Sequence, residues 1–162
     1  MKNDLIQLAN EAMQLENNVS KLYMVFRDTC PEDAEFWWKL VIEEGNHAAL
    51  IKSGIESFMP KDLFPNEILP AELEELQEVN KEIISLLDKY SDSPPTRETA
   101  FNCALKIERS AGEIHFQNAM IKDTDSKRMK LFQNLNQGDK DHEKRIQAYM
   151  KEKGMKEAET EI

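Results

Sequence analysis

The sequence predicts an all-α protein: a four-helix bundle of two antiparallel hairpins, with a long helical crossover between helices 2 and 3. Apolar residues recur at spacings of three and four over long stretches, and no stretch alternates as a strand would. The six prolines fall at four places that separate these stretches. A length of 162 residues makes one domain the expected organisation. We therefore place the bundle at residues 1–153 and a flexible C-terminal tail at residues 154–162.

The first two helices are expected at residues 3–27 and 31–58. The first carries an apolar stripe along one face, formed by Leu5, Leu8, Ala12, Leu15, Val19, Leu22 and Phe26. The second opens at Pro31, because proline suits the first position of a helix. A few residues join the two helices, so they should form an antiparallel hairpin.

The remaining helices are expected at residues 70–90, 97–121 and 126–153. The first of these opens at Pro70 and is rich in glutamate, which indicates a solvated face. The other two are again joined by a few residues and should form a second hairpin. Helices 2 and 3 of the bundle lie about forty residues apart in the sequence. One long crossover in a four-helix bundle is the ferritin-like arrangement.

Charge and composition exclude several classes of protein. The formal net charge is -10, which argues against nucleic acids and anionic membranes as partners because both attract basic surfaces. No apolar run approaches the length of a membrane span, and the N-terminus lacks the apolar region of a signal peptide. The two cysteines are too few for a disulfide scaffold. We expect a cytoplasmic protein.

Polar residues interrupt the apolar stripes at four places. Single carboxylates, Glu16 and Glu108, interrupt the first and third helices of the bundle. Carboxylate–histidine pairs at spacing i, i+3 interrupt the second and fourth, as Glu44 with His47 and Asp139 with His142. The sequence midpoint of Glu16 and Glu44 is residue 30, and that of Glu108 and Asp139 lies between residues 123 and 124. Both midpoints fall in expected turns, so each hairpin should bring one carboxylate level with one pair.

These six residues predict a site for two metal ions. Buried ionised carboxylates are costly unless they are paired, and divalent cations would balance the charge. The donors are oxygen and nitrogen without sulfur, which favours iron or manganese over a structural zinc. Two such pairs and two single carboxylates on four helices are also the pattern of di-iron bundles. The alternative is a metal-free polar core that uses Arg145, near His142, or Arg109, next to Glu108.

Two further features lie on the same helices. Tyr23 is two turns after Glu16 on the same face, where its hydroxyl could donate a hydrogen bond to a ligand carboxylate. The alternative is a core tyrosine with its hydroxyl at the rim. Gly45, Gly112 and Gly138 fall inside expected helices, where glycine is unfavourable relative to alanine. For Gly45 we expect no special role.

The chain resembles the ferritin-like superfamily, and within it the rubrerythrin-type diiron domain. The resemblance rests on four segments: Leu15-Glu16 with Tyr23, Pro31 to Ala34 leading to Glu44 to Ala48, Ala104 to Glu108, and Asp139 with His142 before Arg145 and Ile146. It implies iron ligation by Glu16, Glu44, His47, Glu108 and His142, with Asp139 where the family has glutamate. Two departures are Ala111, where rubrerythrins often have a further carboxylate, and the lack of a Cys-x-x-Cys rubredoxin-like module.

The resemblance implies an oxidoreductase. A centre of two iron ions, with manganese or zinc as possible substitutes, would reduce peroxide or dioxygen with electrons from an external donor protein. Two alternatives remain open at this point. One is a ferroxidase or iron-handling protein, and the other is a metal-poor bundle that serves as an interaction scaffold. We expect a homodimer, which light scattering would distinguish from a storage shell.

Overall fold

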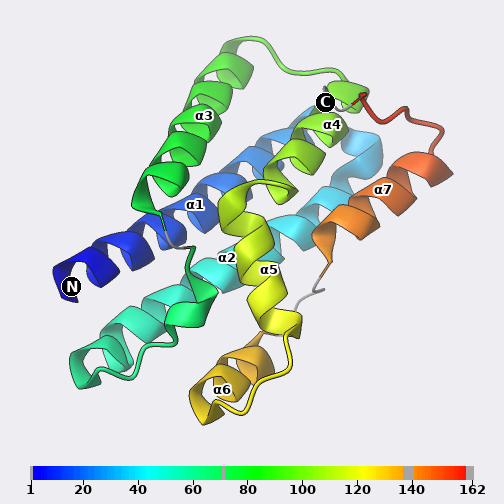
Figure 1. Cartoon of the computed structure of the whole chain (residues 1–162). Helices are drawn as coiled ribbons and strands as arrows, with labels where there is room; N and C mark the ends of the chain where they lie inside the picture. The colour runs from blue at the N-terminus through cyan, green and yellow to red at the C-terminus, as the bar shows by residue number, and fades with distance from the viewer. Residues whose placement is uncertain (1, 71, 137–140, 160–162) are drawn as a thin grey trace.

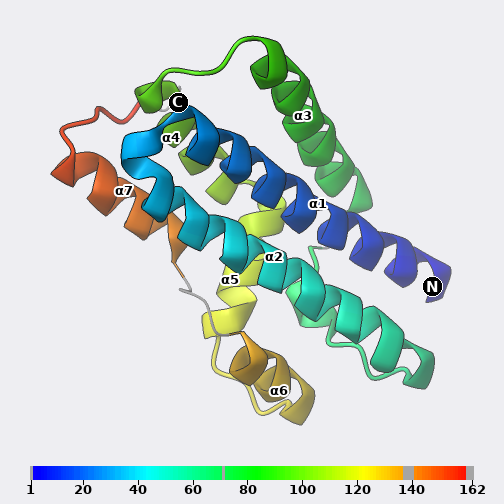
Figure 2. The ribbon, with the colours of Figure 1, turned by 180° about the vertical axis from the view of Figure 1, so that it is seen from behind.

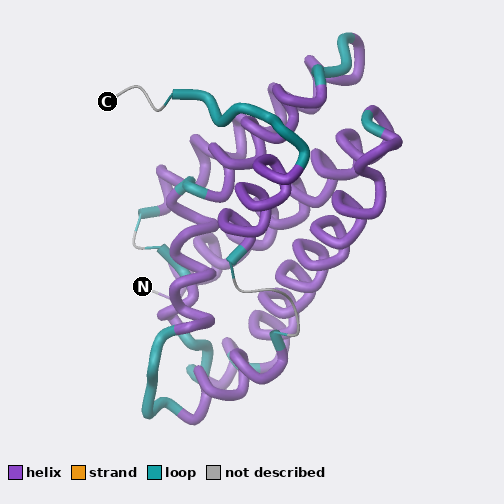
Figure 3. Tube along the Cα trace, turned by 90° about the vertical axis from the view of Figure 1, so that its right-hand side faces the viewer, coloured by secondary structure: helices purple, strands orange, loops and turns teal. Residues whose placement is uncertain are grey.

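The computed structural model describes residues 2–70, 72–136 and 141–159, and this part of the chain is helical without strands (Figure 3). The helices are α1 (Lys2–Thr29), α2 (Ala34–Ser57), α3 (Leu73–Asp92), α4 (Arg97–Glu108), α5 (Ala111–Ile121), α6 (Lys127–Leu135) and α7 (His142–Glu152). Short 3-10 turns lie at Pro31–Asp33, Met59–Lys61 and Asn66–Ile68. The all-α prediction is therefore confirmed.

The two longest helices form the first hairpin. α1 and α2 lie side by side in antiparallel directions (Figures 1 and 2), and this pair makes the most extensive helix contact of the described chain. Pro31 is the first residue of the 3-10 turn between them. Proline lacks a backbone N–H, but the first N–H of a helix has no acceptor within the helix, so no hydrogen bond is lost at this position. The first two helices thus match their predicted positions to within a few residues.

α3 lies in the long connection between α2 and α4, and it packs on α1 (Figure 1). A buried amide contact fixes this packing, because the Asn18 side chain donates to Asn80 Oδ1 at 3.0 Å. The Asn80 amide in turn donates to the backbone oxygen of Glu11 at 3.1 Å. Each buried polar group therefore has a partner, which fixes the register of α3 along α1.

The structure corrects the prediction of a continuous helix over residues 97–121. α4 ends at Glu108, and Ser110 adopts an extended backbone (φ -70°, ψ 157°) before α5 begins. The sequence carries the Ser-x-x-Glu pattern of a helix start at Ser110 and Glu113, although the Ser110 side chain makes no capping hydrogen bond. The apolar spacing continues across this point and conceals the interruption.

The prediction of one helix over residues 126–153 is also wrong. α6 ends at Leu135, and α7 begins only at His142. Asp141 caps α7, because its side chain accepts a hydrogen bond from the backbone N–H of Lys144 at 3.0 Å. An aspartate at this position favours a helix start over a helix interior. Asp139 and Gly138 lie outside the described residues.

The core lies between the α1–α2 hairpin and the helices that cover it. Its largest side chains are aromatic, with Trp37 at the centre of a cluster that includes Tyr23, Phe26, Phe36 and Phe101. Residues 154–159, which we expected to be flexible, follow α7 and contact α4, where Asn102 donates to the backbone oxygen of Lys156 at 2.9 Å. Within the described residues, no helix has both the length and the apolar content to cross a bilayer.

Candidate metal centre

Five of the predicted ligands converge in the core. Glu16 comes from α1, Glu44 and His47 from α2, Glu108 from the last position of α4, and His142 from the first position of α7. Each is at most 2% exposed. The sixth, Asp139, lies outside the described residues.

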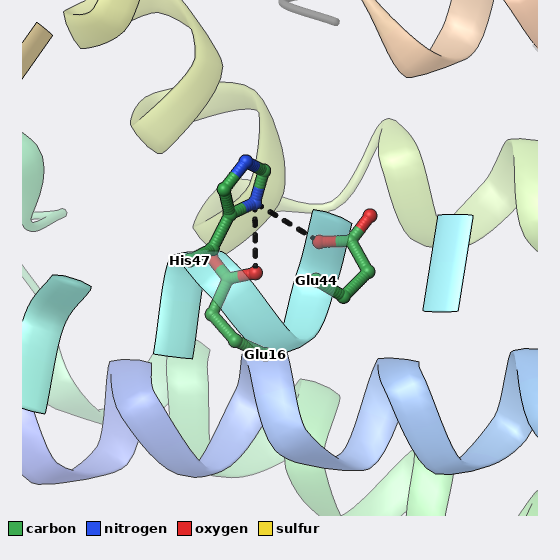
Figure 4. A group of neighbouring side chains, drawn as sticks. All are labelled: Glu16, Glu44 and His47. Carbon is green, nitrogen blue, oxygen red and sulfur yellow. Dashed lines mark hydrogen bonds and ion pairs between the residues drawn. The ribbon is translucent and has the colours of Figure 1, made fainter. Parts of the chain in front are cut away.

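Glu16, Glu44 and His47 form the first group (Figure 4). The Nδ1 atom of His47 lies 3.3 Å from Glu16 Oε2 and 3.1 Å from Glu44 Oε2. The ring of Phe116, 4.6 Å away between centroids, packs against the imidazole and fixes its plane. Two carboxylates and one ring nitrogen therefore point at one small volume.

Glu44, Glu108 and His142 form the second group. The Nδ1 atom of His142 lies 2.6 Å from Glu44 Oε1 and 3.6 Å from Glu108 Oε2. The two imidazole rings are stacked, with centroids 5.5 Å apart. Glu44 thus belongs to both groups and directs a different oxygen into each, which is how a carboxylate bridges two ions.

The spacing of the donor atoms fits metal ions. Two ligands bound at about 2.0–2.2 Å from one ion, at angles of 90–110°, lie about 2.8–3.6 Å apart. The separations of 3.1 and 3.3 Å in the first group and 3.6 Å in the second fall in this range, whereas the 2.6 Å between His142 Nδ1 and Glu44 Oε1 is shorter. The donors are oxygen and nitrogen only, as iron and manganese sites prefer.

Several buried atoms of this cluster have no hydrogen-bond partner among the described residues. They are Glu44 Oε1, His47 Nε2, both ring nitrogens of His142 and both carboxylate oxygens of Glu113. Glu44 Oε1 and His142 Nδ1 approach each other at ion-pair distance but lack the angles of a hydrogen bond. Native interiors rarely leave such atoms unpaired, because each costs about 1–3 kcal/mol. A cation in the second group would satisfy Glu44 Oε1 and His142 Nδ1, so these residues fit a metal centre.

Burial and mutual proximity shift the pKa values of the titratable groups in the cluster. Burial, together with the nearby charge of Glu44, raises the pKa of Glu16 well above its usual value. Burial also acts to raise the pKa of Glu44, but the adjacent imidazoles of His142 and His47 hold it well below its usual value. Burial acts to lower the pKa of His142, while Glu44 and Glu108 raise it well above its usual value. Protons therefore occupy the metal-free cluster, and metal binding would release them.

Glu113 is a functional candidate that sequence reasoning missed. It lies on α5, is fully buried, and burial with the nearby charges of Glu16 and Glu44 raises its pKa well above the usual value. On a continuous helix, residues five apart point in different directions, so Glu108 and Glu113 would not share a face. The break at residues 109–110 turns Glu113 toward the same cluster. The Ser-x-x-Glu pattern was the available signal, but here Glu113 points into the core and the Ser110 side chain makes no capping hydrogen bond.

Hydrogen bonds hold Glu108 in place. The Tyr23 hydroxyl donates to Glu108 Oε1 at 2.6 Å, and the Gln117 amide donates to Glu108 Oε2 at 2.8 Å. Tyr23 is fully buried, and its pKa is raised well above the usual value by burial and by Glu108, so the hydroxyl keeps its proton. This is the contact that the sequence suggested for Tyr23, with Glu108 as the acceptor.

The Glu43 carboxylate lies between the His142 ring and the guanidinium of Arg145. The Nε2 atom of His142 lies 2.9 Å from Glu43 Oε2, at ion-pair distance but without the angles of a hydrogen bond, and Arg145 donates to both oxygens of Glu43 at 3.0 and 2.6 Å. Burial acts to raise the pKa of Glu43, but His142 and Arg145 lower it to about 2, so this carboxylate stays ionised. Carboxylates in this position orient a histidine ligand and leave its other nitrogen for the metal.

The arginines invoked for a metal-free core have other partners. Arg109, next to Glu108 in the sequence, donates to Glu143 at 2.6 Å and to Glu157 at 2.5 Å. The guanidinium of Arg145 donates two hydrogen bonds to Glu43, at the edge of the cluster. The observed ion pairs therefore favour a cation from outside the chain as the partner of the buried carboxylates.

No family model, curated protein or solved structure matches this chain.

Proposed function

We propose that this chain is a rubrerythrin-like diiron protein that reduces peroxide or dioxygen with electrons from an external donor protein. The observation that carries the proposal is the position of Glu44, whose two oxygens face two different carboxylate–histidine groups in one buried cluster. A shared carboxylate between two such groups is typical of paired metal ions in helical bundles.

The arrangement of helices supports a ferritin-like bundle with two interrupted members. In this reading, α1 and α2 are the first hairpin, α3 is the crossover, α4 with α5 is the third member, and α6 with α7 is the fourth. Contacts of α4 with α7 agree with a second antiparallel pair. Both interruptions lie beside candidate ligands, since Glu108 ends α4 and His142 begins α7.

The two ions would be held as the two groups indicate. Glu16, His47 and one oxygen of Glu44 would hold the first, and Glu108, His142 and the other oxygen of Glu44 the second. Glu113, whose two oxygens have no hydrogen-bond partner among the described residues, is a further buried carboxylate that belongs to neither group. When bound, iron supplies one-electron redox changes and open coordination positions for the oxidant.

The surrounding residues orient the ligands and exclude water. Tyr23 and Gln117 fix the two oxygens of Glu108, and Glu43 orients the His142 ring. Tyr23 also holds a proton at its hydroxyl oxygen, 2.6 Å from a ligand carboxylate, where reduction of peroxide to water consumes protons. The apolar core around the cluster keeps out bulk water, which strengthens each of these electrostatic contacts.

Peroxide consumption tests the proposed activity. Protein loaded anaerobically with ferrous iron should consume hydrogen peroxide, and addition of a one-electron reductant should make the reaction catalytic. Glu108→Ala should abolish turnover with helical circular dichroism retained, since it removes one ligand from the second group. Glu78→Ala, on the exposed face of α3, is the matched control and should keep full activity. Equal turnover in the two variants would refute the assignment.

A further inference from the structure

A cavity of about 230 Å³ lies between α5 and α7, and one of its walls is the candidate ligand Glu108. The α5 wall includes Gln117 and Asn118, and the α7 wall includes Glu143 and Gln147. The cavity therefore connects the exposed surface of these two helices with a side chain of the buried cluster.

The lining of this cavity suits a divalent cation. Besides Glu108 it presents the carboxylates of Asp141 and Glu143 and the carboxamides of Gln117, Asn118 and Gln147, whereas Lys144 is its one cationic side chain. The ion pairs of Glu143 with Arg109, at 2.6 Å, and of Asp141 with Lys144, at 3.0 Å, moderate the negative charge without removing the oxygen donors. Hard divalent ions prefer such oxygen ligands.

Gln117 stands between the cavity and the cluster. It is half-buried, its amide nitrogen donates to Glu108 Oε2 at 2.8 Å, and its amide oxygen accepts from the backbone N–H of His142 at 3.2 Å. One side chain thus contacts two residues of the second metal-binding group and also lines the cavity.

We propose that this cavity is the route by which divalent cations reach the buried cluster, with Gln117 as the positioning residue at its inner end. The inference rests on the proposed function, because it requires that the cluster binds metal. It adds the direction of entry, which is through the gap between α5 and α7 toward Glu108 and His142.

The rate of Co²⁺ uptake by metal-free protein tests the route. Cobalt binding can be followed by stopped-flow visible absorbance without redox chemistry. Asn118→Lys places a positive charge on the cavity wall and should slow uptake about three-fold or more at low ionic strength, because charges along a route steer ions. Asn118→Asp should accelerate uptake. Both effects should shrink in high salt.

Asn46→Lys, on the exposed surface of α2 and outside the cavity lining, is the matched control. It changes the net charge equally and should leave the rate unchanged. The amount of Co²⁺ bound at the end should be the same in all folded variants. Rates that are equal in wild type and both Asn118 variants, or a control that slows uptake as much as Asn118→Lys, would overturn the route. Absence of Co²⁺ binding by the wild type would instead overturn the proposed function.

Discussion

Glu113 is a fully buried glutamate beside the candidate metal centre. Its two carboxylate oxygens have no hydrogen-bond partner among the described residues, and burying them therefore costs free energy in the folded state. Four residues that were predicted from the sequence act on its charge, namely Glu16, Glu44, Glu108 and His47. They could be predicted because each breaks an apolar stripe at helical spacing. Glu113 could not, because its direction depends on a break between α4 and α5 that apolar spacing does not reveal.

Replacement of Glu113 by glutamine should stabilise the metal-free protein at neutral pH. The pKa values of Glu16, Glu113 and His142 are all raised in the folded state. Their contribution to the free energy of unfolding is therefore complete below the unfolded pKa values and is lost as pH rises through the folded values. Glu113→Gln should raise the free energy of unfolding at pH 8 by about 1–3 kcal/mol and reduce its fall with pH.

Urea denaturation of metal-free protein between pH 5 and pH 8 measures both effects, with Glu78→Gln as the exposed control. Saturating metal should reverse the trend, because ligands must lose protons to bind it. A pH profile that is unchanged by Glu113→Gln would show that this carboxylate is not a strained member of the cluster.

At the scale of helices, the two unexpected breaks place candidate ligands at helix ends. Glu108 is a carboxylate at the negative end of α4, and His142 is at the positive end of α7, where a protonated imidazole is unfavourable. A cation beside Glu108 would offset the repulsion between this carboxylate and the negative end of α4. Loss of the proton from His142 would remove the repulsion between its imidazolium and the positive end of α7. Helix type and approximate extent followed from apolar spacing. The breaks were not predicted, because the apolar pattern continues past their local signals, Ser110 with Glu113 at one break and Asp141 at the other.

The packing of α5 depends on Gly112. A Cβ atom at this position would overlap the side chain of Leu15 and lie 2.8 Å from Leu76 Cδ2, and both leucines are buried. Gly112→Ala should therefore push α5 away from α1 and lower the free energy of unfolding by about 1–3 kcal/mol. The displacement should also weaken metal binding, because Glu113, the next residue in the sequence, would move away from the cluster together with α5.

Gly45 provides the matched control for this change. A Cβ atom there meets nothing within 4 Å, so Gly45→Ala should raise the free energy of unfolding by about 0.5–1 kcal/mol through helix propensity. Thermal or urea unfolding of the two variants checks the pair. A neutral or stabilising effect of Gly112→Ala would mean that α5 does not need this close approach.

At the scale of the whole molecule, one buried aspartate joins the two halves of the fold. Asp33, in the turn between α1 and α2, accepts two hydrogen bonds from Arg97 at 2.6 Å and one from Tyr149 at 2.8 Å. Arg97 begins α4 and Tyr149 lies on α7. Burial acts to raise the pKa of Asp33, but its bonds to Arg97 and Tyr149 lower it below the usual value.

Asp33→Asn should lower the free energy of unfolding by about 1–3 kcal/mol at neutral pH, because it weakens charge-assisted bonds to a buried group. The wild-type contribution should be lost as pH falls through the lowered pKa of Asp33. Asp28→Asn, at an ion pair whose aspartate is 63% exposed, should change stability by less than about 0.5 kcal/mol. Urea unfolding of both variants measures the contrast, and an equal loss in both would contradict the role of Asp33.

The all-α class, the first hairpin and the existence of α3 could be predicted because their apolar stripes and prolines are local features of the sequence. How the second half returns over the first depends on contacts between distant residues, such as those of Asp33 with Arg97 and Tyr149, which no local pattern encodes. A homodimer remains a prediction for light scattering.

The number of metal ions bound per chain shows whether Glu44 is shared between two ions. Metal-free protein should be reconstituted with ferrous iron under anaerobic conditions, desalted and measured by elemental analysis. We expect two ions per wild-type chain, one in Glu16→Ala and none in Glu44→Ala, because Glu44 alone belongs to both groups. A wild type that retains no iron, or a Glu44→Ala variant that retains both ions, would contradict a shared-carboxylate centre.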